Sequence, residues 1–413
     1  MAKRFLKGKF INLIFCASLC ISMIFMEGCQ STQGNKEKAS GTLNIALEKG
    51  EVEDLDDIKI ILDNFKKYHE NYTVSIVEED NFKNIKDDII NKKYDIVISS
   101  RDTFLTLNEN GLIKDLTSYF NQNKSQNKFY DIVYAYGKVG DKNLGMGLIP
   151  SSIEILYNKN KVLGILEKSD VLSSLKNIVN KESIKVPYIL PKDLSINLAI
   201  SSIVSNSLIK ENNLISIYNR DENKYLDVVD ITNMFKILNS LSKDYGLNGG
   251  KFIKSDISVL EDLNNGEIPF AITTSEVAKN LNYSNIESLT GLRINGYKVT
   301  PPILSRYTVY ATSNSENLQG INTFFDYMIT DEAYTPLVEK GIITGNKKAD
   351  SNFKGLNKIF LTSISKGNIN NIPYYLNLPE SFLKPLNKKL ENIIDYGSYK
   401  DSYWNDIVYE VFK

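Results

Sequence analysis

Polar side chains follow the ends of two apolar strand patterns near the start of the chain. Glu48 comes directly after the first pattern, and Ser99, Ser100 and Arg101 come after the third. Serine hydroxyls donate hydrogen bonds to a ligand, and an arginine guanidinium binds a carboxylate or phosphate through a bidentate pair. A structural interpretation is also open, since Ser100 or Asp102 can cap a following helix and Arg101 can be a solvated surface residue. The pattern therefore predicts either ligand contacts or a helix start at this place.

The sequence contains no recognisable catalytic or metal-binding constellation. The single histidine, His69, lacks the Cys, Ser or second His that a catalytic triad or a zinc site needs, and we expect a solvated residue at a helix end. Neither a glycine-rich phosphate loop nor a calcium loop occurs. The acidic run over residues 51–57 is expected at the start of the first helix, where the helix dipole favours negative charge. The chain is therefore predicted to be no enzyme and to hold no cofactor or metal.

The N-terminal segment has the order of an export signal. It contains all the cysteines of the chain, which are Cys16, Cys20 and Cys29. Basic residues precede an uncharged run over residues 10–25, and Gly28 precedes the last cysteine. This order predicts a lipoprotein signal peptide over residues 1–28, lipidation at Cys29 and a flexible tether over residues 29–40. An uncleaved anchor and ordinary secretion are the alternatives, although the run is shorter than the roughly 20 residues of a membrane-spanning helix. The body is expected on the outer face of the cell membrane.

Composition indicates a globular body of about two domains. Residues 1–28 hold four basic residues and one acidic residue, so the chain of 49 basic and 50 acidic residues has a formal charge of −4 without them. This balance provides no basic field for nucleic acid. A chain of 413 residues exceeds the size at which single cores stop growing, which is roughly 250 to 300 residues. No disulfide can form within the mature chain, so packing alone must stabilise it.

Apolar spacing predicts strands alternating with helices from residue 42 onward. Strands are expected over residues 42–47, 73–77 and 94–98, with helices over 55–65 and 82–89 between them, which is the order of a parallel α/β sheet. Further strands are expected over residues 144–150, 153–157, 184–190, 269–272 and 307–311. Further helices are expected over residues 171–178, 195–208, 231–241 and 321–328, then from a Thr330 cap to Gly341, and over 383–394 and 404–411.

Four segments resemble the extracellular solute-binding proteins of ABC importers, in the branch that includes sugar binders. Residues 108–116 (NENGLIKDL) resemble the family stretch after the third strand, and residues 155–160 (ILYNKN) are similar to its Tyr-Asn-Lys-Asp. Residues 265–272 (NGEIPFAI) stand where relatives have Gly-Lys-x-Ala-Met. The most specific segment, residues 321–333 (INTFFDYMITDEA), resembles Ala-x-x-Phe-x-x-x-Leu-Thr-Ser-Pro-Glu-Ala. Their order and spacing extend this resemblance over nearly the whole mature chain.

The resemblance implies a two-lobed α/β fold of the periplasmic-binding-protein type (type II), with a ligand cleft between the lobes. Such lobes close around a ligand by hinge motion, and α/β sheets bind ligands beyond the carboxyl ends of their strands. A crossover near Pro150 and a return near Arg306 divide the chain. Lobe 1 is then expected over residues 41–150 and 306–345, and lobe 2 over residues 151–305 and 346–413.

Further ligand contacts are expected from this arrangement. Hydroxyls beside the crossover and after the strand ending at residue 272, charges after the strand ending at residue 190, and an aromatic pair before the C-terminal helix all belong to the expected cleft. These residues are Ser151, Ser152, Thr274, Ser275, Lys192, Asp193, Arg306, Tyr374 and Tyr375. Relatives often have paired glycines where Arg306 stands, and they often carry a Gly-Pro-Trp-like segment after residue 273, which is missing here. The single tryptophan, Trp404, is expected in the core.

The resemblance implies a lipid-anchored, monomeric receptor that binds one small solute reversibly and delivers it to the permease subunits of an ABC importer. Sugar or oligosaccharide is the solute expected by family. The missing rings weaken this expectation, and the cations at Arg101 and Arg306 make a smaller polar or anionic solute the alternative. A different possibility is a surface lipoprotein that uses the same fold for sensing or interaction without transport.

Overall fold

The computed structural model describes the residues between 41 and 413 with several gaps. The described ranges are 41–50, 55–123, 127–166, 185–206, 208–244, 246, 249–290, 293–294, 297–298 and 300–413. The expected signal peptide, Cys29, the tether and the helix expected over residues 171–178 lie outside these ranges. Residues 42–413 form one compact unit. Among the described residues, no helix combines the length and the apolar character that crossing a membrane requires.

Two long strands connect the two ends of a nine-stranded mixed sheet. The order is β2-β1-β3-β13-β6-β9-β7-β8, and β10 pairs with the far end of β6. The larger strands of this sheet are β1 (Gly41–Glu48), β2 (Tyr72–Glu79), β3 (Ile96–Ser99), β6 (Gly145–Asn158), β7 (Val186–Ile189), β8 (Phe252–Lys254), β9 (Phe270–Thr274), β10 (Ile286–Ser288) and β13 (Ile303–Ala311). Two small antiparallel pairs lie outside it, β4 (Lys138–Val139) with β5 (Lys142–Asn143) and β11 (Arg293–Ile294) with β12 (Tyr297–Lys298).

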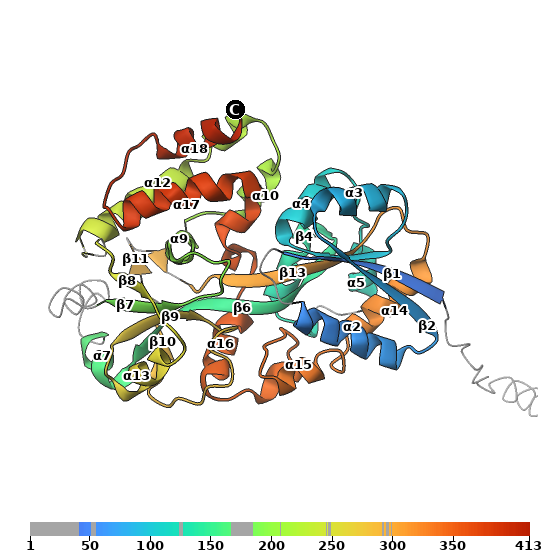
Figure 1. The fold of residues 1–413 in the computed structure, drawn as a ribbon, viewed down its shortest axis with the longest axis horizontal. Coiled ribbons are helices and arrows are strands. Elements are labelled where there is room, and N and C mark those ends of the chain that lie inside the picture. The colour runs from blue at the N-terminus through green and yellow to red at the C-terminus, as the bar shows by residue number, and fades with distance from the viewer. Residues whose placement is uncertain are drawn as a thin grey trace, which may run out of the picture. The chain divides into compact units, whose positions relative to one another are not determined.

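Strand β6 changes its pairing partner along its length. Residues 145–152 pair antiparallel with β13, and residues 153–157 pair antiparallel with β9. We call β2, β1 and β3 the first sheet half, β9, β7 and β8 the second sheet half, and β6 with β13 the crossover strands (Figure 1). Parallel pairs join β1 to β3 and β7 to β9, so the carboxyl ends of these strands are directed at the crossover region.

Helices cover both halves of the sheet. Those before the crossover are α2 (Asp56–Tyr68), α3 (Phe82–Ile90), α4 (Arg101–Glu109), α5 (Thr117–Gln122) and α6 (Asp131–Tyr136). Those that follow β6 are α7 (Lys159–Leu166), α9 (Ile196–Ser205), α10 (Glu211–Ile217), α11 (Glu222–Leu226), α12 (Val229–Asp244) and α13 (Val259–Asn265). After β13 come α14 (Leu318–Met328), α15 (Thr335–Glu339), α16 (Gly355–Ser365), α17 (Leu383–Ile394), α18 (Tyr403–Val411) and the 3₁₀ turns η3 (Ala349–Asn352), η4 (Ile369–Asn371), η5 (Tyr374–Asn377) and η6 (Glu380–Phe382).

Each sheet half has an apolar core of its own. The larger core packs α9, α12, α17 and α18 on the second sheet half, and Figure 1 shows these helices on one side of that sheet. A smaller core joins β1 and β3 to α3 and α4, and it also takes in Ile215 and Tyr218 from α10 and the residue after it. Most of the apolar positions that the sequence spacing predicts as inward-facing are buried, in these two cores and under α2 and α14.

The structure corrects three local predictions. Residues 144–150 and 153–157 are one strand rather than two, because Pro150 lies within the pairing with β13. Thr330 accepts the amide of Ala333 and so caps a turn, whereas the helix itself begins at Thr335 without a side-chain cap. His69 does end α2, but it is half-buried and its ring packs on Phe65 at 4.6 Å between ring centroids.

Candidate functional site

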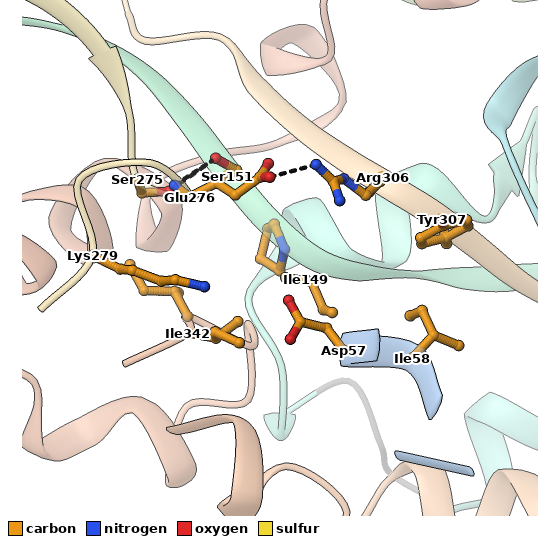
Figure 2. A pocket seen from close by; sticks show the side chains of 12 residues that line it. Asp57, Ile58, Ile149, Ser151, Ser275, Glu276, Lys279, Arg306, Tyr307 and Ile342 are labelled. Carbon is orange, nitrogen blue, oxygen red and sulfur yellow. Dashed lines mark hydrogen bonds and ion pairs between the residues drawn. The ribbon is translucent and has the colours of Figure 1, made fainter. Parts of the chain in front are cut away.

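A pocket lies where the crossover strands run between the two sheet halves, and we call it the crossover pocket (Figure 2). Its empty volume is about 460 Å³, a figure that includes open solvent above it. The lining comes from α2, the crossover strands, the loop after β9 and the segment before η3. The lining residues are Asp57, Ile58, Ile149, Pro150, Ser151, Ser275, Glu276, Lys279, Arg306, Tyr307, Ile342 and Ile343.

Two serine hydroxyls tie one wall of the pocket to its floor. The backbone amide of Ser152 donates to Ser275 Oγ at 3.1 Å, and Ser275 Oγ donates to Ser151 Oγ at 3.1 Å. The amide of Glu276 also donates to Ser151 Oγ, at 3.2 Å. A serine oxygen accepts twice and donates once. Both acceptor positions of Ser151 are therefore filled, and its own proton is left to donate.

Four charged side chains line the pocket, and two of them form an ion pair. Arg306 Nη2 contacts Glu276 Oε1, with about a quarter of the Arg306 side chain and a third of the Glu276 side chain exposed. Burial raises the pKa of the Glu276 carboxyl, and the positive charge of Arg306 offsets part of this rise by lowering it. The charges of Asp57 and Lys279 also act on Glu276. Neither of these two side chains forms a hydrogen bond or an ion pair with another part of the described chain.

The backbone departs from regular strand geometry at Ile149, in the pocket lining. Its φ is +54°, a left-handed conformation that a β-branched residue rarely adopts. The strand pairing is interrupted at the same point, since Leu148 pairs with Tyr307 and Pro150 with Ser305. Arg306 stands opposite Ile149 at this interruption. Residues in such conformations cluster at functional sites, where the surrounding structure holds them.

Arg101, predicted as a ligand contact, lies outside the crossover pocket in a buried network. Its Nε donates to Asn377 Oδ1 at 2.7 Å, and its Nη1 donates to the carbonyl oxygen of Tyr136 at 2.6 Å. Asn377 in turn donates through Nδ2 to Glu211 Oε2. Nη2 of Arg101 and Oε1 of Glu211 have no hydrogen-bond partner among the described residues. The guanidinium therefore connects α4, next to the first sheet half, to α6 and η5, and Asn377 extends this connection to α10.

Glu48, Ser99 and Ser100 are engaged in interactions around the start of α4. Glu48 accepts the Ser100 amide at 2.6 Å and the Thr103 hydroxyl at 2.5 Å. Ser100 is the N-cap of α4, as the structural interpretation of the sequence predicts, and Ser99 is fully buried with its hydroxyl 2.7 Å from that of Tyr310. None of the three lines the crossover pocket, and their contact with a ligand stays a prediction.

The remaining predicted site residues are divided between the pocket and its surroundings. Ser151, Ser275 and Arg306 line the pocket. The others do not line it: Ser152 and Thr274 are fully buried in their strands, Tyr374 and Tyr375 are buried in the core of the second sheet half, and Lys192 and Asp193 are exposed. The negative charge of Asp193 also acts to raise the pKa of Glu276.

The aromatic side chains at and near the site do not present an exposed flat face on which a sugar could stack. Tyr307 is the aromatic residue in the lining, and only 1% of it is exposed. Trp404 is also 1% exposed, donates to the carbonyl oxygen of Tyr225 at 2.7 Å and stacks on Phe382, which confirms its predicted core position. Tyr374 and Tyr375 pack edge to face on each other instead of presenting a flat surface.

The sequence pattern missed the pocket residues Asp57, Glu276 and Lys279. Asp57 lies in the acidic run that was predicted at the start of α2, and it does lie there. Its side chain is directed at Lys279 (Figure 2), which lies more than 200 residues away in the sequence, so local spacing could not show that Asp57 lines a pocket. Glu276 directly follows the predicted Ser275. In the described part of the chain, no cluster of His, Cys, Asp or Glu has the arrangement of a metal site.

Comparison with known proteins gives matches only at the level of structure. No protein-family model and no curated protein sequence matches the chain. A probable secreted solute-binding lipoprotein from Streptomyces coelicolor is similar over 90% of this chain and 98% of its own, with 11% sequence identity and a TM-score of 0.63.

Two sugar-binding proteins are similar over the same region. A cyclo/maltodextrin-binding protein complexed with maltotetraose covers 91% of this chain and 97% of its own, with 14% identity and a TM-score of 0.62. The Thermus thermophilus maltotriose binding protein bound with maltotriose covers 90% and 99%, with 15% identity and a TM-score of 0.56. The chain therefore has the fold of the solute-binding proteins, and the predicted fold class is confirmed. The predicted lobe boundaries stay a prediction.

Proposed function

We propose that this chain is an extracytoplasmic, lipid-anchored receptor that binds one small polar solute and delivers it to an ABC importer. The observation that carries the proposal is the crossover pocket, which takes its lining from α2 beside the first sheet half, from the loop after β9 in the second half and from the crossover strands. Pockets at such junctions bury small ligands, and movement of the two halves about the crossover strands would open and close this one. Lipidation at Cys29 and docking of a permease belong to the same proposal.

The solute class follows first from the fold. Sugars are the class bound by two of the structural relatives, and a small anion is the alternative because Arg306 and Lys279 line the pocket. Binding would be reversible and non-covalent, with Ser151 as hydrogen-bond donor and the charged residues as orienting groups. No chemical step is part of this function.

A thermal-shift screen of the full chain tests the proposal. A solute that binds only the folded protein raises the melting temperature by mass action. We expect one small solute to raise it and Ser151→Ala with Arg306→Met to reduce the shift. Ser216→Ala, an exposed serine away from the pocket, serves as control. A screen of sugars, amino acids, organic acids and nucleosides without any shift would contradict solute binding.

A second function, sensing or interaction without transport, is favoured by one observation. Tyr218, next to α10, donates to Asp102 Oδ1 at 2.5 Å and lies in the same apolar core as β1 and β3. This contact joins the two halves on the α4 side, and wide opening would break it. Pull-down of a protein partner by a chain that binds no solute would favour this second function.

A further inference from the structure

Asp57 and Lys279 place opposite, unpaired charges on opposite walls of the crossover pocket. Asp57 comes from the first turn of α2, and Lys279 from the loop after β9. In Figure 2 the carboxylate and the ammonium group point toward each other across the opening. Both side chains are half-buried, and neither has a hydrogen bond or ion pair within the described ranges. The other two charges of the lining, Arg306 and Glu276, already pair with each other.

This layout favours a ligand that carries both charges over the single-charged anion kept above as the alternative. An anion attracted to Lys279 would also meet Asp57 and Glu276, and a cation attracted to Asp57 would meet Lys279 and Arg306. Attraction and repulsion between unit charges are equal in size at equal distance, so a single mismatched contact cancels a matched one. The four lining charges sum to zero. A ligand with one charge at each end meets an opposite charge on each wall.

The rest of the lining fits the body of such a ligand. Ser151 has its own proton left to donate, because two donors already fill its acceptor positions. A ligand carboxylate beside Lys279 would accept a hydrogen bond from this hydroxyl. Ile149, Ile342 and Pro150 give the pocket an apolar surface for an aliphatic group. The one aromatic ring in the lining, Tyr307, is buried and offers no face on which a sugar would stack.

We propose that the solute is a small zwitterion with an aliphatic body, of the amino-acid or dipeptide class. Its ammonium group binds Asp57, and its carboxylate binds Lys279 and Ser151. This inference rests on the proposed function, since it names the solute class of the same pocket. The halves that supply the two charges are the halves whose approach would close the pocket, so the ligand joins them by its two ends.

Binding of matched probes to the full chain tests the charge requirement. The probes are leucine and leucyl-leucine, N-acetylleucine, which lacks the cation, leucinamide, which lacks the anion, and maltotriose. We expect leucine or leucyl-leucine to raise the melting temperature and to give a measurable Kd by calorimetry. The two blocked leucines should bind at least tenfold more weakly.

Variants of the two walls test which end each residue binds. Asp57→Asn should weaken zwitterion binding at least tenfold and remove the preference for leucine over N-acetylleucine. Lys279→Met should do the same for the preference over leucinamide. Asp63→Asn, on the same helix, and Lys83→Met, on α3, are exposed controls that should leave affinity unchanged. A merely structural role of Asp57 or Lys279 would lower the affinity for all probes alike and would not exchange these preferences.

The outcomes separate this inference from the function on which it rests. Binding of maltotriose without binding of either zwitterion would overturn the zwitterion and leave the solute receptor intact. Equal binding of N-acetylleucine and leucine by the unaltered chain would also overturn it. If none of the five probes binds, the zwitterion class is wrong, and the broader solute screen alone decides whether the chain is a receptor.

Discussion

Glu211 is the buried acid in the hydrogen-bond network around Arg101, and its pKa is strongly raised. Burial raises the pKa of Glu211 to about 8, although Asn377 and the charge of Arg101 both favour the ionised form. Burial lowers the pKa of Arg101 to about 10, so the guanidinium is still protonated at neutral pH. The folded protein therefore holds the Glu211 proton more tightly than the unfolded chain, whose carboxyl titrates near 4.5. This contribution to stability is complete below pH 4.5 and is lost as the pH rises through about 8.

Glu211→Gln should reduce the pH dependence of stability. The amide mimics the protonated acid, so the fall in unfolding free energy between pH 5 and pH 8.5 should be smaller in the variant, by about 1.4 kcal/mol for each unit of pKa shift removed. Urea denaturation at pH 5, 7 and 8.5 measures this. Glu154 and Asp350, with pKa values raised to about 7 and about 6, contribute equally to both proteins. Parallel curves for the two proteins would show that Glu211 is ionised in the fold.

Ile149 offers a second test at the residue scale. A left-handed conformation costs a side chain with a Cβ roughly 1–2 kcal/mol, and glycine avoids this cost. Ile155 is on the same strand, is also half-buried and has no positive φ. Ile155→Gly should therefore lower the unfolding free energy by about 1–2 kcal/mol more than Ile149→Gly does, measured by urea denaturation. Equal losses would mean that the strand holds Ile149 without strain.

At the scale of elements, α4 is hydrogen-bonded to η5 through the side-chain amide of Asn377. Asn377 bonds to Arg101 and to Glu211 and is fully buried. Asn377→Ala would leave the Arg101 guanidinium and the Glu211 carboxyl without that partner, and an unsatisfied buried polar group costs about 1–3 kcal/mol, or more when it is charged. Asn370→Ala, an exposed change just before η5, should cost little. Chemical denaturation compares the two, and a similar small loss in both would show that water replaces the Asn377 contacts.

Element prediction succeeded where apolar spacing alone decides structure. The strands at β1, β2 and β3 and the helices α2, α3, α17 and α18 follow their predicted spacing within a few residues, because each buries one regular face. Helix α4 escaped prediction except through its cap at Ser100, since its buried face includes Arg101, which sequence reasoning treats as a surface residue. The partners that bury Arg101 come from residues 136 and 377, far along the chain.

The candidate site was predictable in part for a similar reason. Ser151, Ser275 and Arg306 were found because strand ends and crossovers are local sequence features. The pair of Asp57 and Lys279 depends on the distance between two distant segments, which no local pattern encodes. Lys192 and Asp193 follow a strand end as predicted and are exposed, and their contact with a ligand stays a prediction.

At the scale of the whole molecule, a solute bound in the crossover pocket should protect both sheet halves together. Amide hydrogen exchange reports such local ordering. With a solute that raises the melting temperature, we expect slower exchange in the first turn of α2, over residues 275–279 and around Ile149. Residues of α18, which pack far from the pocket lining in the core of the second sheet half, should not change. Protection confined to one half would place the solute elsewhere.

Strand β13 comes late in the sequence but lies between β3 and β6 in the sheet, so the sheet cannot be completed before residues 303–311 are present. Ser99 pairs with Thr308, and β6 from its beginning also needs β13 as a neighbour. A ribosome must therefore add some 200 residues after β3 before the edge of that strand is covered. Until then β3 exposes unpaired backbone groups to other chains, which is a hazard for aggregation. A chain that stops before residue 303 would lack the strand that covers the edge of its own first sheet half.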